Sequence, residues 1–337
     1  MPAGQGAIKD ATRRATTATP TKQPIPIHRF SHYFFLYPMR FLTLSLAAAL
    51  LLASPLAHAQ KAAKTPKSTP AAAAPKALLY EISGNKLAKP SYVFGTIHLL
   101  CAADLKLSEA VQKAVGSSQQ VALELDMDSP TMGEEMRGLL MLPAGQTVQS
   151  CMSKEEYAAV SDYYTTQLQM PFAQMTNMKP FILASLLYPK MLGCPVGSYE
   201  MSLVEVAKTK NMEVIGLETV ADQMGLFDKI PCEKQARMLS DMVIKRAEAQ
   251  QEFTDLLTLY RAQDVEGLLK MSLNSKFGMK EYETQLLTDR NKRWIPLMAQ
   301  EAARKPTFFA VGAAHLGGPN GVLALLRQQG YQVKPVL

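Results

Sequence analysis

Two histidines of this sequence lie in the same short pattern and could do chemistry together. His98 lies in the run Val93-Phe-Gly-Thr-Ile-His-Leu, and His315 lies in the run Ala310-Val-Gly-Ala-Ala-His-Leu. In each run a glycine after apolar residues lets the backbone turn or approach another segment closely. A single histidine at the end of a strand is more often a structural hydrogen-bonding residue, but the repeated pattern favours function. We therefore predict one site that contains both imidazoles.

Carboxylates follow two further apolar runs. Glu124 and Asp126 end the run that begins at Val121, and Glu218 follows Val214-Ile-Gly-Leu. Sites in open α/β folds form at the edge of the sheet where the carboxyl ends of parallel strands meet. The sequence thus predicts that Glu124 and Glu218 join the two histidines, with Asp126 as the weaker candidate.

The chemistry of this set has two interpretations. Two imidazoles and two carboxylates suit a divalent ion such as Zn²⁺, Mn²⁺ or Co²⁺, which could activate water and polarise a carbonyl. In a metal-free alternative, a histidine is the general base and a glutamate orients it or accepts its proton. Nucleophilic catalysis is less favoured because the sequence has no Gly-x-Ser-x-Gly, although Cys101 is a possible thiol nucleophile.

The elements that would position these residues are short apolar runs separated by longer stretches of helical periodicity. Strands are predicted over 78–82, 92–96, 120–125, 213–217, 307–311 and 332–336. Helices are predicted over 105–115, 181–192, 202–210, 235–260, 282–304 and 321–329, and capping boxes at Thr131 and Ser153 open two more. This order predicts an α/β fold, with a central, mostly parallel sheet flanked by helices and a helical insertion or cap in the middle of the domain.

The N-terminal segment has the pattern of an export signal. Arg40 precedes a short apolar run that ends in Ala57-His-Ala59, and this run is shorter than the roughly 20 residues of a membrane span. We expect cleavage near Ala59, a periplasmic or secreted mature protein and no transmembrane anchor in it. The predicted parts are an over-extended or non-native N-terminus (1–38), a signal peptide (39–59), a disordered Ala/Pro/Lys linker (60–76) and one folded domain (77–337).

The charge of the chain lies mostly outside the domain. The chain has 36 basic and 29 acidic residues, of which the first 76 positions hold ten basic residues and one acidic residue. The remaining 26 basic and 28 acidic residues leave the domain close to neutral. Nucleic acid is therefore not an expected partner.

All four cysteines lie in the domain, at positions 101, 151, 194 and 232. An oxidising compartment permits disulfides, and four cysteines allow three full pairings among which the sequence does not choose. Structural bridges are favoured over a thiol nucleophile at Cys101.

In their order along the chain, these residues resemble the TraB/GumN family, which is related to the Tiki proteases and more distantly to ChaN and erythromycin esterase. The resemblance covers about residues 78 to 337. It rests on Gly95-Thr-Ile-His98, Leu123-Glu124-Leu-Asp126, Gly216-Leu-Glu218 with Gln223, Asp289-Arg290-Asn291 with Trp294, and Gly312-Ala-Ala-His315.

The resemblance implies an α/β fold and one site built from both Gly-x-x-His turns. It implies that His98 and His315 are metal ligands or catalytic residues and that Glu124 and Glu218 are ligands or the general base. We assign the metal to His98, Glu124 and His315 and the base to Glu218, with substrate or oxyanion contacts from Arg290 and Asn291. One departure is Gly197-Ser-Tyr-Glu200, where many relatives have Gly-x-Asp and where Glu200 can substitute.

We therefore expect an exported, metal-dependent hydrolase that acts on a peptide or small-molecule substrate, with Mn²⁺, Co²⁺ or Zn²⁺ as its ion. A peptidase is favoured. The alternative is a non-catalytic protein that sequesters a peptide, haem or a metal.

Overall fold

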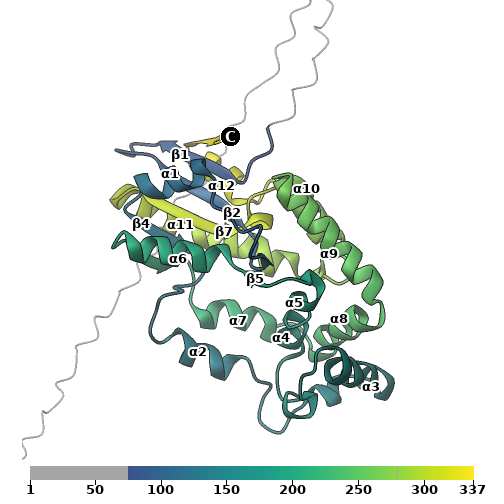
Figure 1. The fold of residues 1–337 in the computed structure, drawn as a ribbon. Coiled ribbons are helices and arrows are strands. Elements are labelled where there is room, and N and C mark those ends of the chain that lie inside the picture. Colours follow the sequence, from purple (N-terminus) through teal and green to yellow (C-terminus); the bar gives the residue numbers. More distant parts are fainter. Residues whose placement is uncertain (1–74, 279) are drawn as a thin grey trace, which may run out of the picture. The chain divides into compact units, whose positions relative to one another are not determined.

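The computed structural model describes residues 75–278 and 280–337, which belong to one compact unit (Figure 1). The predicted N-terminal extension, the signal peptide and almost all of the predicted linker lie outside the described residues. In the described part, no helix combines the length and the apolar character that crossing a membrane requires.

The core of the unit is a six-stranded sheet in the order β6-β4-β7-β2-β1-β8. Strands β2, β7, β4 and β6 run parallel, while β1 is antiparallel to both of its neighbours. The strands are β1 (Leu79–Gly84), β2 (Ser91–Thr96), β4 (Gln120–Leu123), β6 (Glu213–Gly216), β7 (Thr307–Gly312) and β8 (Tyr331–Pro335). All six predicted strands and the α/β fold class are confirmed.

The register brings four parallel strand ends to one edge of the sheet. Thr96 of β2 pairs with Gly312 of β7, and Leu123 of β4 pairs with Gly216 of β6. The candidate residues follow these positions by one to three residues. The topology thus places them side by side, as their positions after the strands predict.

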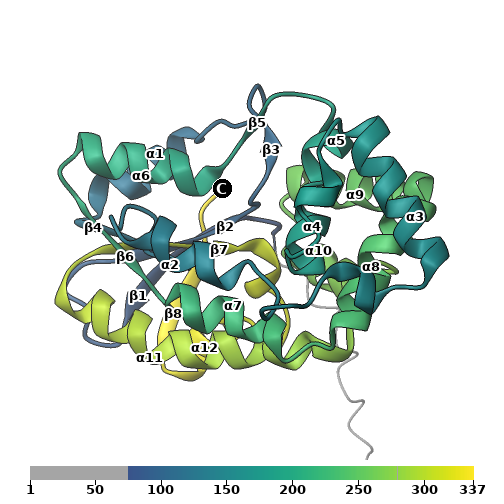
Figure 2. The same cartoon turned by 90° about the horizontal axis from the view of Figure 1, so that it is seen from below.

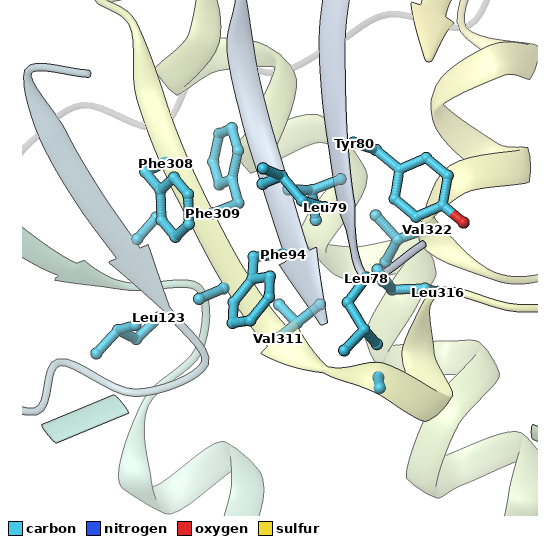
Figure 3. Packing of buried hydrophobic residues seen from close by; sticks show 14 of the residues in the cluster. Leu78, Leu79, Tyr80, Phe94, Leu123, Phe308, Phe309, Val311, Leu316 and Val322 are labelled. Carbon is cyan, nitrogen blue, oxygen red and sulfur yellow. The ribbon is translucent and has the colours of Figure 1, made fainter. Parts of the chain in front are cut away.

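Helices cover both faces of this sheet. Figure 2 shows α1 (Glu109–Ser117) and α6 (Tyr199–Thr209) on one face, with α11 (Asp289–Arg304) and α12 (Val322–Gln328) on the other. Strand β7 is therefore buried on both sides, which is why its sequence is a continuous apolar run. The core around this strand contains labelled aromatic and aliphatic side chains of β1, β2, β4 and β7 (Figure 3).

A second group of helices, drawn from the middle of the sequence, forms the predicted helical cap with its own apolar core (Figure 2). It contains η1 (Val148–Cys151), α3 (Lys154–Asp162), η2 (Tyr163–Gln167), η3 (Phe172–Gln174), α4 (Pro180–Ser185), α5 (Tyr188–Leu192), α8 (Cys232–Ile244) and α9 (Arg246–Arg261). Helix α10 (Val265–Asn274) buries Val265 and Leu268 in the core of the sheet instead. Further elements are α2 (Met132–Leu139), α7 (Val220–Asp228), η4 (Lys280–Tyr282), η5 (Thr284–Thr288) and η6 (Ala313–His315).

Several helix boundaries differ from the prediction. The helix predicted over 235–260 breaks between α8 and α9 at Lys245, and the helix predicted over 181–192 divides into α4 and α5. The capping box at Ser153 forms, but Thr131 has helical backbone angles and makes no side-chain cap. Periodicity alone did not locate these breaks, because the apolar pattern continues through them.

Two disulfides select one of the three possible pairings. Cys101 is bonded to Cys194, and Cys151 is bonded to Cys232. A thiol nucleophile at Cys101 is therefore not available in this structure. Two disulfides fit an exported protein, because such bonds persist in oxidising compartments.

Candidate functional site

Arg290, in the first turn of α11, lies at the centre of the strand-end residues. Its Nη2 atom donates to Glu124 Oε2 and to Glu218 Oε1, each at 2.5 Å, and its Nη1 atom lies 3.0 Å from His315 Nε2. Arg290, Glu124 and His315 are all buried, and the Glu218 side chain is 3% exposed. The guanidinium therefore neutralises part of the negative charge that two buried carboxylates bring.

Every donor group of Arg290 has a partner within the protein. Nε donates to Glu218, and Nη1 donates to the Leu286 carbonyl as well as to His315. The guanidinium carbon also lies 4.7 Å from the centre of the Trp294 ring, in a cation–π contact. No side of the guanidinium is thus left for an oxyanion in this arrangement. The geometry favours a positioning role, and the predicted oxyanion contact stays a prediction.

Asn291 fixes the tautomer of His315. The Asn291 Nδ2 atom donates to the carbonyls of His315 and Asn320 at 3.3 and 2.9 Å, so its Oδ1 is the acceptor that lies 2.6 Å from His315 Nδ1. His315 therefore carries its proton on Nδ1 and offers the Nε2 lone pair to Arg290. Burial lowers the pKa of His315 to about 3, which keeps the ring neutral.

Glu124 is held as a buried carboxylate from three sides. Gly312 N donates to its Oε1 at 2.8 Å, and Gln223 Nε2 joins Glu124 Oε2 to Glu218 Oε1 at 3.1 and 3.0 Å. Burial by itself would raise the pKa of Glu124, but the nearby Arg290 charge overcomes it and brings the pKa to about 2. Glu124 is therefore ionised over the whole physiological range.

His98 lies at the end of the neighbouring strand and has a different partner. Its Nδ1 atom lies 3.1 Å from Oε1 of Glu200, near the start of α6. Glu200 is buried and also accepts hydrogen bonds from Thr96 Oγ1 at 2.7 Å and Ser198 Oγ at 2.6 Å. The His98 side chain is 69% exposed, whereas that of Glu200 is 10% exposed. His98 and Glu200 thus form an acid–base pair with one member facing solvent.

Electrostatics connect this pair to the Arg290 cluster. The hydrogen bond that His98 Nδ1 donates to the Glu200 carboxylate is the largest influence on His98 and raises its pKa to about 9, with a smaller contribution from the charge of Glu124. The two Gly-x-x-His turns also pack on each other, since a Cβ at Gly95 would lie 3.1 Å from Cα of Ala313. The glycine is therefore required for a close approach between the two turns.

The structure thus joins Glu124, Glu218, Arg290, Asn291 and His315 in one hydrogen-bonded cluster and sets His98 beside it. Asp126 lies outside this cluster and lines a cavity of about 470 Å³ next to Glu218. Glu200 contacts His98 directly, a partner that the sequence did not predict for this histidine. The signal for Glu200 was the Gly-Ser-Tyr-Glu segment, which was weak because the sequence does not reveal that α6 begins beside β2.

Comparison with known proteins identifies the family of this chain. A family model described as the TraB/PrgY/gumN family matches residues 78–335. The chain belongs to this family. Among curated proteins it is 24% identical over 300 residues to Metalloprotease TIKI2 of Danio rerio, covering 73% of this chain and 58% of the relative. It is 25% identical over 302 residues to Metalloprotease TIKI1 of Homo sapiens, covering 73% and 59% respectively.

The predicted family is therefore confirmed. The chain spans about six tenths of the length of these TIKI relatives. No solved structure matches the chain.

The names of these TraB/PrgY/gumN relatives raise the question of a metal. In the described part of the chain, no three His, Cys, Asp or Glu side chains are grouped as a metal ion would require. Both oxygens of Glu218, Oε2 of Glu124 and Nε2 of His315 lie within hydrogen-bond distance of Arg290, and the other Glu124 oxygen accepts from Gly312 N. A divalent ion among these three side chains would therefore lie against a guanidinium. The side chains as arranged do not fit a metal, and the predicted ligands His98, Glu124 and His315 stay a prediction.

The buried neutral His315 predicts a loss of stability in mild acid. The unfolded ring binds a proton near pH 6.5 and the folded ring near pH 3, so the unfolded state holds more protons between these values. The free energy of unfolding should therefore fall as pH drops through this window, by at most about 1.4 kcal/mol per pH unit for one proton.

Denaturant titrations between pH 6 and 5 measure this slope where the opposing contribution of His98, whose raised pKa makes the folded state hold more protons near pH 6.5, has become small. His315→Gln should give a flatter dependence, whatever its own stability. Equal slopes in the two proteins would show that His315 is not the group responsible.

Proposed function

We propose that this protein is an exported hydrolase that cleaves peptide bonds, and that His98 and Glu200 form its proton-transfer pair. The observation that supports this most is the asymmetry of the pair, with an exposed imidazole held through Nδ1 by a buried carboxylate. In such a pair Nε2 is the ring atom available to water or substrate. The names of the TIKI relatives support a peptide as the substrate class.

In the proposed reaction, Nε2 of neutral His98 accepts a proton from a water molecule. The resulting hydroxide adds to the carbonyl carbon of the peptide bond. The carbon–nitrogen bond then breaks, and the proton on His98 passes to the departing amine nitrogen. The products are one carboxylic acid and one amine, and His98 returns to its neutral form.

Glu200 stabilises the imidazolium that forms during this reaction. Its carboxylate contacts His98 Nδ1 and is itself fixed by Thr96 and Ser198. The Arg290 cluster next to it contains two carboxylates and one guanidinium, which leaves a net negative charge near His98 when His315 is neutral. This charge favours the protonated imidazole, so the cluster assists the reaction without contacting the reacting atoms.

The names of the TIKI relatives also suggest a divalent ion such as Mn²⁺, Co²⁺ or Zn²⁺. Because the ligating atoms of Glu124, Glu218 and His315 face Arg290, we expect cleavage to persist after treatment with a chelator and dialysis. Elemental analysis of the purified protein, before and after loading with each ion, should find less than one ion per chain. Loss of cleavage on chelation, with recovery on adding one of these ions, would show instead that an ion displaces Arg290 during turnover.

A peptide-library assay tests the proposal itself. The exported protein with both disulfides intact is incubated with a library of blocked peptides, and cleavage products are identified by mass spectrometry. Wild type should cleave a subset that His98→Gln leaves intact, while Glu205→Gln, an exposed change on the same helix as Glu200, should cleave like wild type. Peptides that bind to wild type without being cleaved would support the sequestering alternative, as would binding of haem or a metal alone.

A further inference from the structure

The disulfide between Cys101 and Cys194 joins the two segments that carry the proton-transfer pair. Cys101 lies three residues after His98, and Cys194 lies six residues before Glu200. The segment that contains Cys194 leaves α5 of the helical cap at Gly193 and enters α6 beside the sheet. The bridge therefore ties the His98 loop to the chain just before Glu200.

Other links between these two segments are few. Strands β3 (Leu100–Cys101) and β5 (Val196–Gly197) pair over two residues each, with one further backbone hydrogen bond from Ala102 N to Pro195 O at 2.8 Å. A ladder this short is marginal without support. Leu100 is buried in the core, and Thr96 Oγ1 donates to Glu200 at 2.7 Å, but Val196 is 42% exposed and the His98 side chain is 69% exposed. The stretch between His98 and Cys101 is therefore only partly held by packing. The covalent bond is the strongest link between the segments.

We propose that the Cys101–Cys194 bridge positions His98 against Glu200, so that the site becomes competent only after the bridge forms in an oxidising compartment. This inference rests on the proposed function. One dithiol, or two equivalents of a monothiol, opens the bridge by giving it two electrons and two protons, which yields two cysteine thiols and the disulfide of the reductant. The newly made chain is then inactive before export, and a reducing environment switches the exported protein off.

The second disulfide is a matched control. Cys151 and Cys232 join η1 to the start of α8 within the helical cap. The two bridges span 93 and 81 residues of sequence, so the chain-entropy model assigns them nearly equal stabilisation. A difference in activity between the two bridge deletions therefore reflects where each bridge lies relative to His98 and Glu200, and not a difference in the stability of the fold.

The test compares Cys101→Ser/Cys194→Ser with Cys151→Ser/Cys232→Ser, using a peptide that wild type cleaves. The first double variant should lose about 10- to 100-fold in kcat, the size expected from misplacing a reacting group, with a smaller change in KM. The second should keep the wild-type kcat. Wild type treated with dithiothreitol should behave like the first variant and should recover when the bridge is reoxidised.

A second readout does not depend on cleavage. Residues 60–337 contain two histidines, His98 and His315, so selective ¹⁵N labelling gives two sets of imidazole signals. Loss of the Cys101–Cys194 bridge should shift the His98 signals and leave those of buried His315 in place, which also shows that the fold survives. Unchanged kcat and unchanged His98 signals in the first variant would overturn the inference. Absence of cleavage by oxidised wild type would instead count against the proposed function, while the His98 signals would still decide the role of the bridge.

Discussion

Replacing Arg290 by methionine is expected to lower the free energy of unfolding by about 3–5 kcal/mol, the cost of leaving buried charges without a partner. The substitution removes the only guanidinium that contacts both Glu124 and Glu218 within the described residues. Arg293→Met is the control, because Arg293 approaches Glu218 no closer than 3.8 Å and its side chain is 49% exposed. Exposed pairs of this kind contribute about 0–1 kcal/mol. Denaturant unfolding at pH 7 measures both variants.

A combined variant separates charge from packing. Adding Glu124→Gln and Glu218→Gln to Arg290→Met removes the uncompensated carboxylates and should recover part of the lost stability, because neutral side chains of similar shape need no counter-charge. A further loss in the combined variant would mean that the three residues contribute mainly through packing. A change of less than about 1 kcal/mol for Arg290→Met alone would show that Arg290 does not hold the cluster together.

Replacing His98 by glutamine is expected to lower kcat/KM by about 10²–10⁴-fold, the usual contribution of a general acid–base group. The free energy of unfolding should fall at neutral pH, because the substitution removes the charge pair that raises the pKa of His98, but Glu200 keeps its hydrogen bonds from Thr96 and Ser198. Rates are therefore compared under conditions in which the unfolding curves show each variant to be folded. Glu200→Gln keeps the shape of the side chain and removes the charge that stabilises the imidazolium, so its loss of kcat/KM should be smaller than that of His98→Gln. Glu205→Gln on the same helix should leave kcat/KM unchanged.

These rates are measured on one peptide taken from the library screen, with unfolding curves recorded for each variant. A loss of activity that follows a loss of stability would indicate a structural effect. Wild-type activity in His98→Gln would rule out the proposed role of His98.

Much of this arrangement could be predicted from the sequence. The four parallel strands and the residues after them are encoded locally, by short apolar runs and the glycines that end them. Because parallel strands must end at the same edge of a sheet, Glu124, Glu218 and His315 could be placed together without a structure. The helical cap also followed from periodicity, although its breaks at Lys245 and between α4 and α5 did not.

The partners within the site could not be predicted in this way. Arg290 reaches Glu124 across 166 residues of sequence, and the position of α11 against the sheet depends on tertiary packing. The sequence predicted one site, either around a metal or with a histidine base oriented by a glutamate, whereas the described residues divide into a buried cluster around Arg290 and an exposed pair, His98 and Glu200. Residue types could suggest a metal site, but only the fold shows that the Arg290 guanidinium contacts Glu124, Glu218 and His315, three of the side chains that would bind the metal.

The pH dependence of kcat/KM tests the proton-transfer pair most directly, because this ratio reports the ionisation of groups in the free enzyme. Glu200 raises the pKa of His98 to about 9, so wild type is mostly protonated at pH 7 and its kcat/KM should rise with pH to a plateau above about pH 9. Glu200→Gln removes that influence, and its profile should reach a plateau at lower pH, with an apparent pKa moved toward the ordinary histidine value of 6.5. Identical profiles in the two proteins, or activity that falls as pH rises from 6.5 to 9, would contradict the assignment of His98 and Glu200.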